Sequence, residues 1–476
     1  MKKALFFITL IFTAVLILSG CGEKAGSASS NNSPTLQTND RFLDNTSNNI
    51  TDSTEKSETN KPNTESTDTE SDQTTNPTPD EEIVTPKPSD RVILNHKNMK
   101  AMWLSQFDLT SIYSNYVEQR SEKDFRNKIK TVLKNVSNSG CNTIMVQIRP
   151  YADSFYPSEY YPPSRYVTGS YSSDFSYDPF KIIVEEAHKI NLSVHAWFNP
   201  LRAMTTSEIK DVDNTYKIKQ WYNDSQKNGT YLVEYNGRFY LNPAYSEVRQ
   251  LIVDGVNEIV QKYNVDGVHM DDYFYPTTDA SFDSKAYNNH LAGGSTISLK
   301  QFRHNNLNML VSSIYSTVKA VDKELQYGIS PEGNMNNSIE KGYADIYTWC
   351  SSDGYIDYIC PQIYFGFEHQ SFPFDTVADK WNSIIKNSNV RLIVGLTLGK
   401  ALDKHDQWAG TGADEWADHN NILKRCIEYT KTLDKCSGVA FFSYQHFYDP
   451  NLFTEIEETK AERDNFIPTL NKIIWR

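Results

Sequence analysis

From about residue 93 onward, short apolar runs alternate with stretches whose apolar residues recur every three to four positions. Bounded apolar runs of this kind predict buried strands, and the amphipathic stretches predict helices. The predicted strands are 101–105, 143–150, 192–200, 265–272, 327–334, 358–365, 391–399 and 438–445. The predicted helices include 123–136, 179–189 and 299–321. Eight strands that alternate with helices favour an α/β fold, a (β/α)8 barrel over residues 93–476, with a doubly wound open sheet as the competing arrangement.

The fourth of these strands ends in two adjacent carboxylates, Asp271 and Asp272, which a purely structural strand would lack. Side chains alternate between the two faces of a strand. If Val268 and Met270 point outward to covering helices, His269 and Asp271 point inward. Chemistry in sheets of β-α units takes place at the carboxyl ends of the strands. The pattern therefore predicts an active-site strand.

Three local features shape the expected helices and loops. Asn236-Gly237 predicts a tight hairpin turn within a long insertion after the third strand. Asn242, followed by Pro243, is expected to cap the next helix. The polar run 303–306 lies within a predicted helix and is interpreted as a solvated face.

The first 21 residues have the features of a secretory leader. Lys2 and Lys3 precede an apolar run from Ala4 to Leu18, and Leu18-Ser19-Gly20-Cys21 matches the lipobox of bacterial lipoproteins. We expect a leader over 1–20, acylation of Cys21, and a protein anchored in the lipid membrane on its extracytoplasmic face. An uncleaved N-terminal membrane helix is the alternative, but the apolar run is short for a span.

Residues 21–92 form the next segment, which is rich in Ser, Thr, Asn, Asp, Glu and Pro and lacks apolar periodicity. Such a composition cannot bury enough surface to offset its ordering entropy, so we predict a disordered linker. Between residues 22 and 90 it holds fourteen acidic and five basic residues, against −13 for the whole chain. The acidity therefore belongs mostly to the linker and says little about the substrate.

The cysteines do not suggest a metal centre. Apart from Cys21 there are five, none with the spacing of a metal site, and we expect neither a metal nor a cofactor. A disulfide could join Cys350 to Cys360 or Cys426 to Cys436, and buried free thiols are the blander alternative. The chain also lacks the glycine-rich loops that bind nucleotides, the Gly-x-Ser-x-Gly motif and the basic patches of nucleic-acid-binding proteins.

The predicted strand ends carry polar and aromatic residues suited to binding sugars, whose rings pack on aromatic faces and whose hydroxyls need hydrogen-bond partners. For any one of these residues, plugging the barrel mouth is an equally good explanation. The predicted substrate-binding residues are Gln147, Arg149, His195, Trp197, Asn199, His269, Tyr273, Asn334, Gln362, Tyr364 and Tyr444.

Hydrolysis of a glycosidic bond requires two carboxyl groups, which lie about 5–5.5 Å apart in retaining enzymes. Asp271 and Glu332 end neighbouring predicted strands, which would lie roughly 4.8 Å apart. Asp271 is the predicted nucleophile, Glu332 the acid and then the base, and His269 a hydrogen-bond partner that keeps Asp271 ionised. Asp272 is a further catalytic candidate, or else a supporting residue paired with Arg149 or Arg202.

Several motifs in these strands resemble the bacterial glycosyl-hydrolase-like family 10 lipoproteins. They are 103–108, 147–150, 195–200, 241–244, 266–276, 329–331, 358–364 and 394–396. The resemblance implies a TIM barrel, an envelope location and a glycosidase, and some members are associated with cleaving peptide-free peptidoglycan strands. More distantly, 267–271 is similar to the fourth-strand motif of α-amylase-type retaining enzymes, which implies that Asp271 is the nucleophile.

We therefore expect an envelope-anchored glycosidase that acts on an envelope or extracellular glycan. A glycan-binding lipoprotein that kept the barrel but lost one carboxylate is the main alternative. A structural envelope protein, in which the Asp-Asp pair would be salt-bridged and closed off from solvent, is the third.

Overall fold

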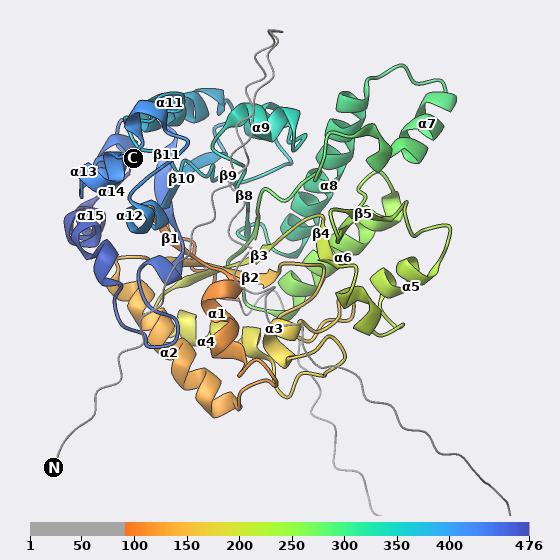
Figure 1. Ribbon diagram of the computed structural model, residues 1–476, viewed down its shortest axis with the longest axis horizontal. Helices are drawn as coiled ribbons and strands as arrows, with labels where there is room; N and C mark the ends of the chain where they lie inside the picture. The colour runs from red at the N-terminus through yellow and green to blue at the C-terminus, as the bar shows by residue number, and fades with distance from the viewer. Residues whose placement is uncertain (1–90, 476) are drawn as a thin grey trace, which may run out of the picture. The chain divides into compact units, whose positions relative to one another are not determined.

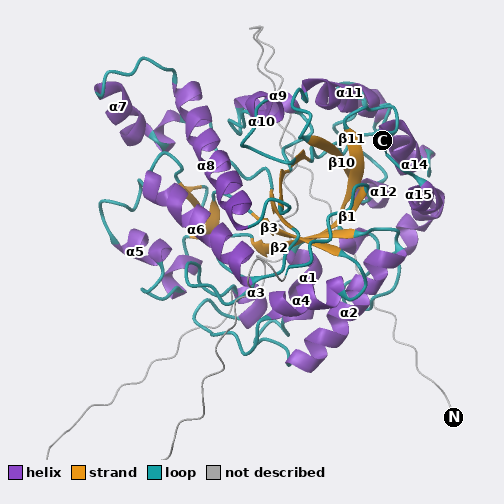
Figure 2. Cartoon of the chain, turned by 180° about the vertical axis from the view of Figure 1, so that it is seen from behind, coloured by secondary structure: helices purple, strands orange, loops and turns teal. Residues whose placement is uncertain are grey.

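The computed structural model describes residues 91–475, which form a closed barrel of eight parallel strands inside a ring of helices (Figures 1 and 2). The strand order around the barrel is β1-β11-β10-β9-β8-β7-β3-β2. The strands are β1 Met99–Leu104, β2 Thr143–Arg149, β3 Ser193–Phe198, β7 Gly267–Met270, β8 Gln326–Ile329, β9 Tyr358–Ile359, β10 Arg391–Thr397 and β11 Cys436–Phe442. The predicted (β/α)8 barrel is confirmed. The predicted leader, Cys21 and the linker as far as residue 90 lie outside the described residues.

Helices between successive strands pack on the outside of the barrel. The longer ones are α2 Glu122–Asn138, α4 Pro179–His188, α6 Ser246–Lys262, α8 Leu299–Val321, α11 Phe374–Ile384, α14 Ile422–Thr430 and α15 Lys460–Lys472. Shorter helices in the loops are α1 Gln106–Tyr113, α3 Arg165–Thr168, α5 Lys217–Asn223, α7 Ser284–Ala292, α9 Met335–Glu340, α10 Ile346–Ser351, α12 Gly399–Asp403 and α13 Glu415–Asp418. Helices α2, α4 and α8 occupy the predicted ranges.

The faces of β7 match the alternation in its sequence. Val268 and Met270 belong to the large core between strands and helices, whereas His269 faces the barrel interior beside Trp103 and Tyr358. The interior is tightly filled, since a Cβ atom at Gly328 would collide with the Tyr358 ring. The barrel is therefore a packed core, and its residues can meet a ligand only at one end.

The chain between β3 and α6 forms a small antiparallel sheet of order β4-β6-β5, with β4 Arg202–Thr205, β5 Leu232–Tyr235 and β6 Arg238–Leu241. The predicted hairpin joins β5 to β6, and both turn residues have positive φ, 52° at Asn236 and 78° at Gly237. The predicted cap at Asn242 is wrong, because α6 begins three residues after Pro243, at Ser246. The Asn242 side chain instead bonds within the connection, to the Thr230 carbonyl and the Ala244 N–H.

The polar run 303–306 is not a solvated face, which corrects the prediction. Arg303 is fully buried, and His304 and Asn306 are buried as well. Arg303 pairs with Asp283, which lies at the start of α7, so the segment from 277 to 283 covers this side of α8. A polar helix face looks solvated in the sequence when its cover comes from a loop with no apolar periodicity.

The five cysteines of the described residues are all buried free thiols, so neither proposed disulfide forms. Within residues 91–475, no helix combines the length and apolar character needed to cross a membrane.

Candidate active site

Three carboxyl groups meet where β7 and β8 end. Asp271 and Asp272 directly follow β7, whose last carbonyl, that of Met270, accepts a hydrogen bond from Ser330 N–H at 2.8 Å. Glu332 lies two residues beyond Ser330 and forms a parallel bridge with Gln362, which follows β9. The carboxyl ends of adjacent strands thus bring the three acidic side chains to one edge of the barrel.

Asp271 is held by donors from two directions. Trp197 Nε1 donates to its Oδ2 at 2.9 Å, and the Tyr273 N–H donates to its Oδ1 at 3.3 Å. Burial, and then the charge of Asp272, hold the pKa of Asp271 well above its usual value, although the hydrogen bonds from Trp197 and Tyr273 and the charge of Arg202 lower it in part. The donors favour the ionised carboxylate and so offset part of the effect of burial.

Asp272 and Glu332 also titrate unusually. Burial, and then the charge of Glu332, raise the pKa of Asp272 to about 7, against a hydrogen bond from Gln362 that lowers it. Burial raises the pKa of Glu332, whose Oε2 accepts from Asn337 Nδ2 at 3.0 Å. Interacting carboxyl groups share their protons, so near neutral pH the trio carries fewer than three negative charges.

His269 does not contact Asp271, which corrects the sequence-based prediction. Its Nε2 accepts from Trp103 Nε1 at 3.1 Å, and its Nδ1 lies 3.0 Å from the Tyr358 hydroxyl. Burial lowers the pKa of His269 well below its usual value, so the ring is neutral. Trp197, from the neighbouring strand, has the supporting role that the prediction gave to His269.

His195 lies deeper in the same interior. It is fully buried, and its Nδ1 is 2.9 Å from the Tyr358 hydroxyl. Burial lowers its pKa to about 4. His195 and His269 therefore share a hydrogen-bond partner, the Tyr358 hydroxyl, inside the barrel. This position leaves them away from the site where a substrate would bind.

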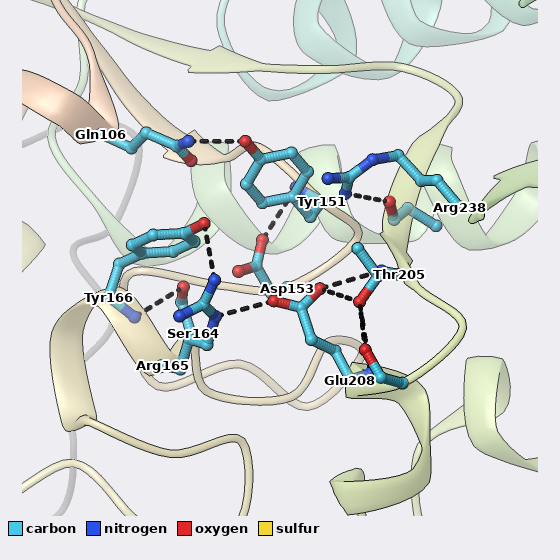
Figure 3. Close-up of polar contacts among 11 residues, drawn as sticks. Gln106, Tyr151, Asp153, Ser164, Arg165, Tyr166, Thr205, Glu208 and Arg238 are labelled. Carbon is cyan, nitrogen blue, oxygen red and sulfur yellow. Dashed lines mark hydrogen bonds and ion pairs between the residues drawn. The ribbon is translucent and has the colours of Figure 1, made fainter. Parts of the chain in front are cut away.

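Other predicted substrate contacts form a network at the ends of β1, β2 and β3. Gln147 Nε2 donates to Asn199 Oδ1 at 2.9 Å, and Gln147 Oε1 accepts from the Gln106 N–H at 2.9 Å. Gln106 Nε2 in turn donates to the Tyr151 hydroxyl at 2.6 Å (Figure 3). On the opposite side, the Tyr364 ring lies 6.0 Å from that of Phe442.

The structure places three predicted substrate contacts elsewhere. The Arg149 guanidinium is buried between the rings of Tyr161 and Phe198, 4.5 and 4.6 Å from their centroids. Tyr444 is fully buried, and its hydroxyl accepts from Asn135 of α2. Asn334 caps α9, with its side chain accepting from the N–H groups of residues 336 and 337. The structure therefore gives Arg149 and Tyr444 positions within the packed protein and Asn334 a helix-capping role.

Sequence reasoning missed a stack of alternating arginine and tyrosine side chains beside the carboxylates. The Arg202 guanidinium carbon lies 4.4 Å from the Tyr273 ring centroid and 4.8 Å from that of Tyr151. Arg238 lies over the same Tyr151 ring at 4.3 Å (Figure 3). The sequence suggested Arg202 only as a partner of Asp272, and it gave no sign of a role for Arg238. Only the Asp-Asp-Tyr sequence hinted that aromatics continue from the carboxylates.

A closed (β/α)8 barrel with clustered carboxyl groups at its carboxyl end is the architecture of the TIM-barrel glycosidases. The family model described as glycosyl hydrolase-like 10 matches residues 98–409, and the chain belongs to this family. The chain is therefore a glycosidase by family.

Similar relatives agree with this assignment, and one solved structure shares the fold. The chain is 31% identical over 365 residues to glycosyl hydrolase YngK of Bacillus subtilis (strain 168), covering 73% of this chain and 68% of the relative. It is 27% identical over 410 residues to glycosyl hydrolase DigH of Escherichia coli (strain K12), covering 78% and 90%. The catalytic domain of β-amylase from Paenibacillus polymyxa aligns with a TM-score of 0.50 at 10% identity, covering 79% and 99%, which shows the shared fold alone.

Proposed function

We propose that this chain hydrolyses O-glycosidic bonds of an envelope or extracellular glycan, with peptide-free peptidoglycan strands as the foremost candidate, by a retaining two-carboxylate mechanism. The observation that carries the proposal is the group of three carboxyl groups at the ends of β7 and β8, in which Asp271 receives two donated hydrogen bonds. Neighbouring strands lie about 4.8 Å apart, which favours the short separation of a retaining pair over the longer one of an inverting pair.

Asp271 is the nucleophile in this mechanism. Trp197 and the Tyr273 N–H favour its ionised form and fix its orientation. Glu332 protonates the leaving oxygen and then activates water, and Asp272 is the alternative acid. Both have raised pKa values, which suit a group that must hold a proton, but the pKa of Asp271 is raised too, so the donors to Asp271 and not the pKa values support the division of roles.

We also propose that acylated Cys21 anchors the protein to the membrane at its extracytoplasmic face. The lipobox at 18–21 supports this location, and the polar segment that follows would give the barrel reach from the membrane toward a wall polymer. Both features belong to the N-terminal part of the sequence, so the proposal rests on sequence alone.

Digestion of defined polymers tests the proposed function. A soluble form that begins at residue 91 and its Asp271→Asn variant would be incubated with intact peptidoglycan, peptide-free glycan strands and α- and β-glucans. Fragments that the wild type alone releases from the peptide-free strands, identified by mass, are the expected result. Binding to one polymer without release would contradict the hydrolytic proposal and favour a glycan-binding protein.

The pH dependence of kcat/KM should show whether Asp272 takes part in the proton transfer. If Asp272 is the general acid, kcat/KM falls as pH rises through about 7, because Asp272 then loses the proton that it must donate. Asp272→Asn should remove this alkaline limb. It should also move the acid limb to lower pH, since removing the neighbouring negative charge lowers the pKa of Asp271. Superimposable pH profiles of the variant and the wild type would remove Asp272 from the chemistry.

A further inference from the structure

The inserted sheet β4-β6-β5 presents a polar and aromatic face. In β6, Phe239 and Leu241 are buried in the core, while Arg238 and Tyr240, which alternate with them, are half-buried. Because residues two apart in a strand share a face, Arg238 and Tyr240 lie on the opposite side from Phe239 and Leu241, where Tyr240 still packs in part against the core. Tyr235 of β5 pairs directly with Arg238, and its ring lies 6.5 Å from that of Tyr240.

This face continues into the carboxylate site. Arg202, at the start of β4, pairs with Tyr240 across the sheet and stacks between Tyr151 and Tyr273. Tyr273 comes two residues after Asp271. Each step of the stack that runs from Tyr273 through Arg202 and Tyr151 to Arg238 measures less than 5 Å. The stack therefore links the carboxylates to this face of the sheet.

Arg238 brings a positive charge to this face, part of which the nearby Glu208 carboxylate balances. One N–H of its Nη1 is donated to the Ala203 carbonyl at 2.8 Å. The nearby Glu208 is already occupied by Arg165 at 2.7 Å and by the Thr205 hydroxyl at 2.8 Å (Figure 3). The other guanidinium donors of Arg238 have the fork geometry that suits a carboxylate.

We infer that this face is a subsite for a sugar that carries a free carboxylate, with Arg238 pairing to the carboxylate and Tyr235 and Tyr240 packing against the sugar ring. The inference rests on the proposed function and narrows its substrate to an acidic glycan. One guanidinium matches the single charge of a carboxylate, and masking that charge as an amide should remove most of the recognition.

The structural alternative is that Arg238 only fixes the fold of the sheet, by bonding to Ala203 where the β4-β6 register shifts. Two substitutions separate the alternatives. Arg238→Gln keeps an amide donor for this carbonyl but removes the charge. Arg238→Lys keeps the charge but removes the planar fork. Arg425→Gln is the matched control, since Arg425 of α14 stacks on Phe367 at 4.2 Å and is partly exposed.

The test compares two probes with the full chain in detergent. One is peptide-free peptidoglycan strands with their native carboxylates, and the other is the same strands after conversion of the carboxylates to methylamides. Affinity is measured by calorimetry in the Asp271→Asn background, hydrolysis is measured with Asp271 intact, and a thermal melt of each variant checks folding.

We expect amidation to weaken binding to the parent chain by roughly tenfold or more, the scale of a charged hydrogen bond. Arg238→Gln should bind both probes equally, at the weaker affinity. Arg238→Lys should regain part of the preference, and Arg425→Gln should keep all of it. Equal binding of both probes by the parent chain, or an undiminished preference in Arg238→Gln, would overturn the subsite.

The same experiment separates the two proposals. Preferential binding of the carboxylated strands without hydrolysis supports the subsite and contradicts the proposed function. Hydrolysis of both probes at equal kcat/KM supports the proposed function and overturns the subsite.

Discussion

Asp271→Asn is expected to lower kcat on the cleaved glycan by on the order of 10⁴-fold or more, as loss of a nucleophile does in other hydrolases. The amide is nearly isosteric with the carboxylate, and its oxygen can still accept the Trp197 N–H, so the fold should persist. The loss would therefore reflect chemistry, because an amide cannot form the glycosyl-enzyme bond. Initial rates of fragment release measure the loss in kcat, and a thermal melt of the variant shows whether the fold persists.

The choice of substrate can distinguish the residue that acts as the general acid from the residue that acts as the nucleophile. Glu332→Gln should lower kcat on the polymer by about 10² to 10⁴-fold, the usual contribution of general acid catalysis. An aryl glycoside whose leaving group needs no proton should still glycosylate the Glu332→Gln enzyme at close to the normal rate, but not the Asp271→Asn enzyme. If Asp272→Asn gives this pattern and Glu332→Gln does not, Asp272 is the acid. Wild-type turnover by Asp271→Asn would transfer the nucleophilic role to Asp272.

The barrel could be predicted because its signals are local. Each strand is a short apolar run with clear breakers, and the observed strands begin within two residues of the predicted starts. The acidic cluster could be predicted for the same reason, since Asp271 and Asp272 directly follow one such strand, Glu332 lies three residues after the next, and the topology brings neighbouring ends together. The turn at Asn236-Gly237 needed only the preference of these two residues for positive φ.

Two predicted substrate contacts, Arg149 and Tyr444, lie elsewhere because of small departures from regular strand geometry. A register shift between Gln147 and Arg149 turns Arg149 to the outer side, against Tyr161. β11 ends at Phe442, and the 3-10 turn that follows moves Tyr444 behind the barrel wall. Strict alternation, which placed His269 correctly on the inner face, gave no sign of either change.

Other features could not be predicted because they join segments far apart in the sequence. His269 faces inward as expected, but its partners, Trp103 and Tyr358, come from strands on other sides of the barrel. The stack of Arg202, Tyr151 and Arg238 joins the β2 loop to an insertion with no repeating pattern. Such contacts depend on the three-dimensional path of the loops, which a single sequence does not specify.

One buried ion pair holds the loop that follows the active-site carboxylates in place. Arg303 of α8 binds both oxygens of Asp283, with Nε to Oδ2 at 3.0 Å and Nη2 to Oδ1 at 2.8 Å, and both side chains are 0% exposed. The same guanidinium donates to the carbonyls of Thr277 and Asp279 at 3.1 and 2.6 Å and lies 5.0 Å from the Tyr275 ring centroid. It thus holds the loop that begins at Asp272.

Asp283→Ala should therefore lower the free energy of unfolding of the barrel by about 3–5 kcal/mol, because it leaves a buried guanidinium without its counter-charge. Glu428→Ala is the control, since it breaks the exposed pair with Lys424 and should cost less than about 1 kcal/mol. Denaturant unfolding of both variants measures the difference, and equal costs would show that the Asp283 pair is not the anchor.

A double variant, Asp283→Leu with Arg303→Met, distinguishes the two roles of the pair. Replacing a buried ion pair by apolar side chains of similar size is often neutral, so much of the lost stability should return. The donors to Thr277 and Asp279 would still be missing, and the loop that begins at Asp272 would lose its attachment to α8. We therefore expect kcat/KM to stay low in a protein of near-normal stability, which would show that Arg303 positions the catalytic loop as well as holding the fold together.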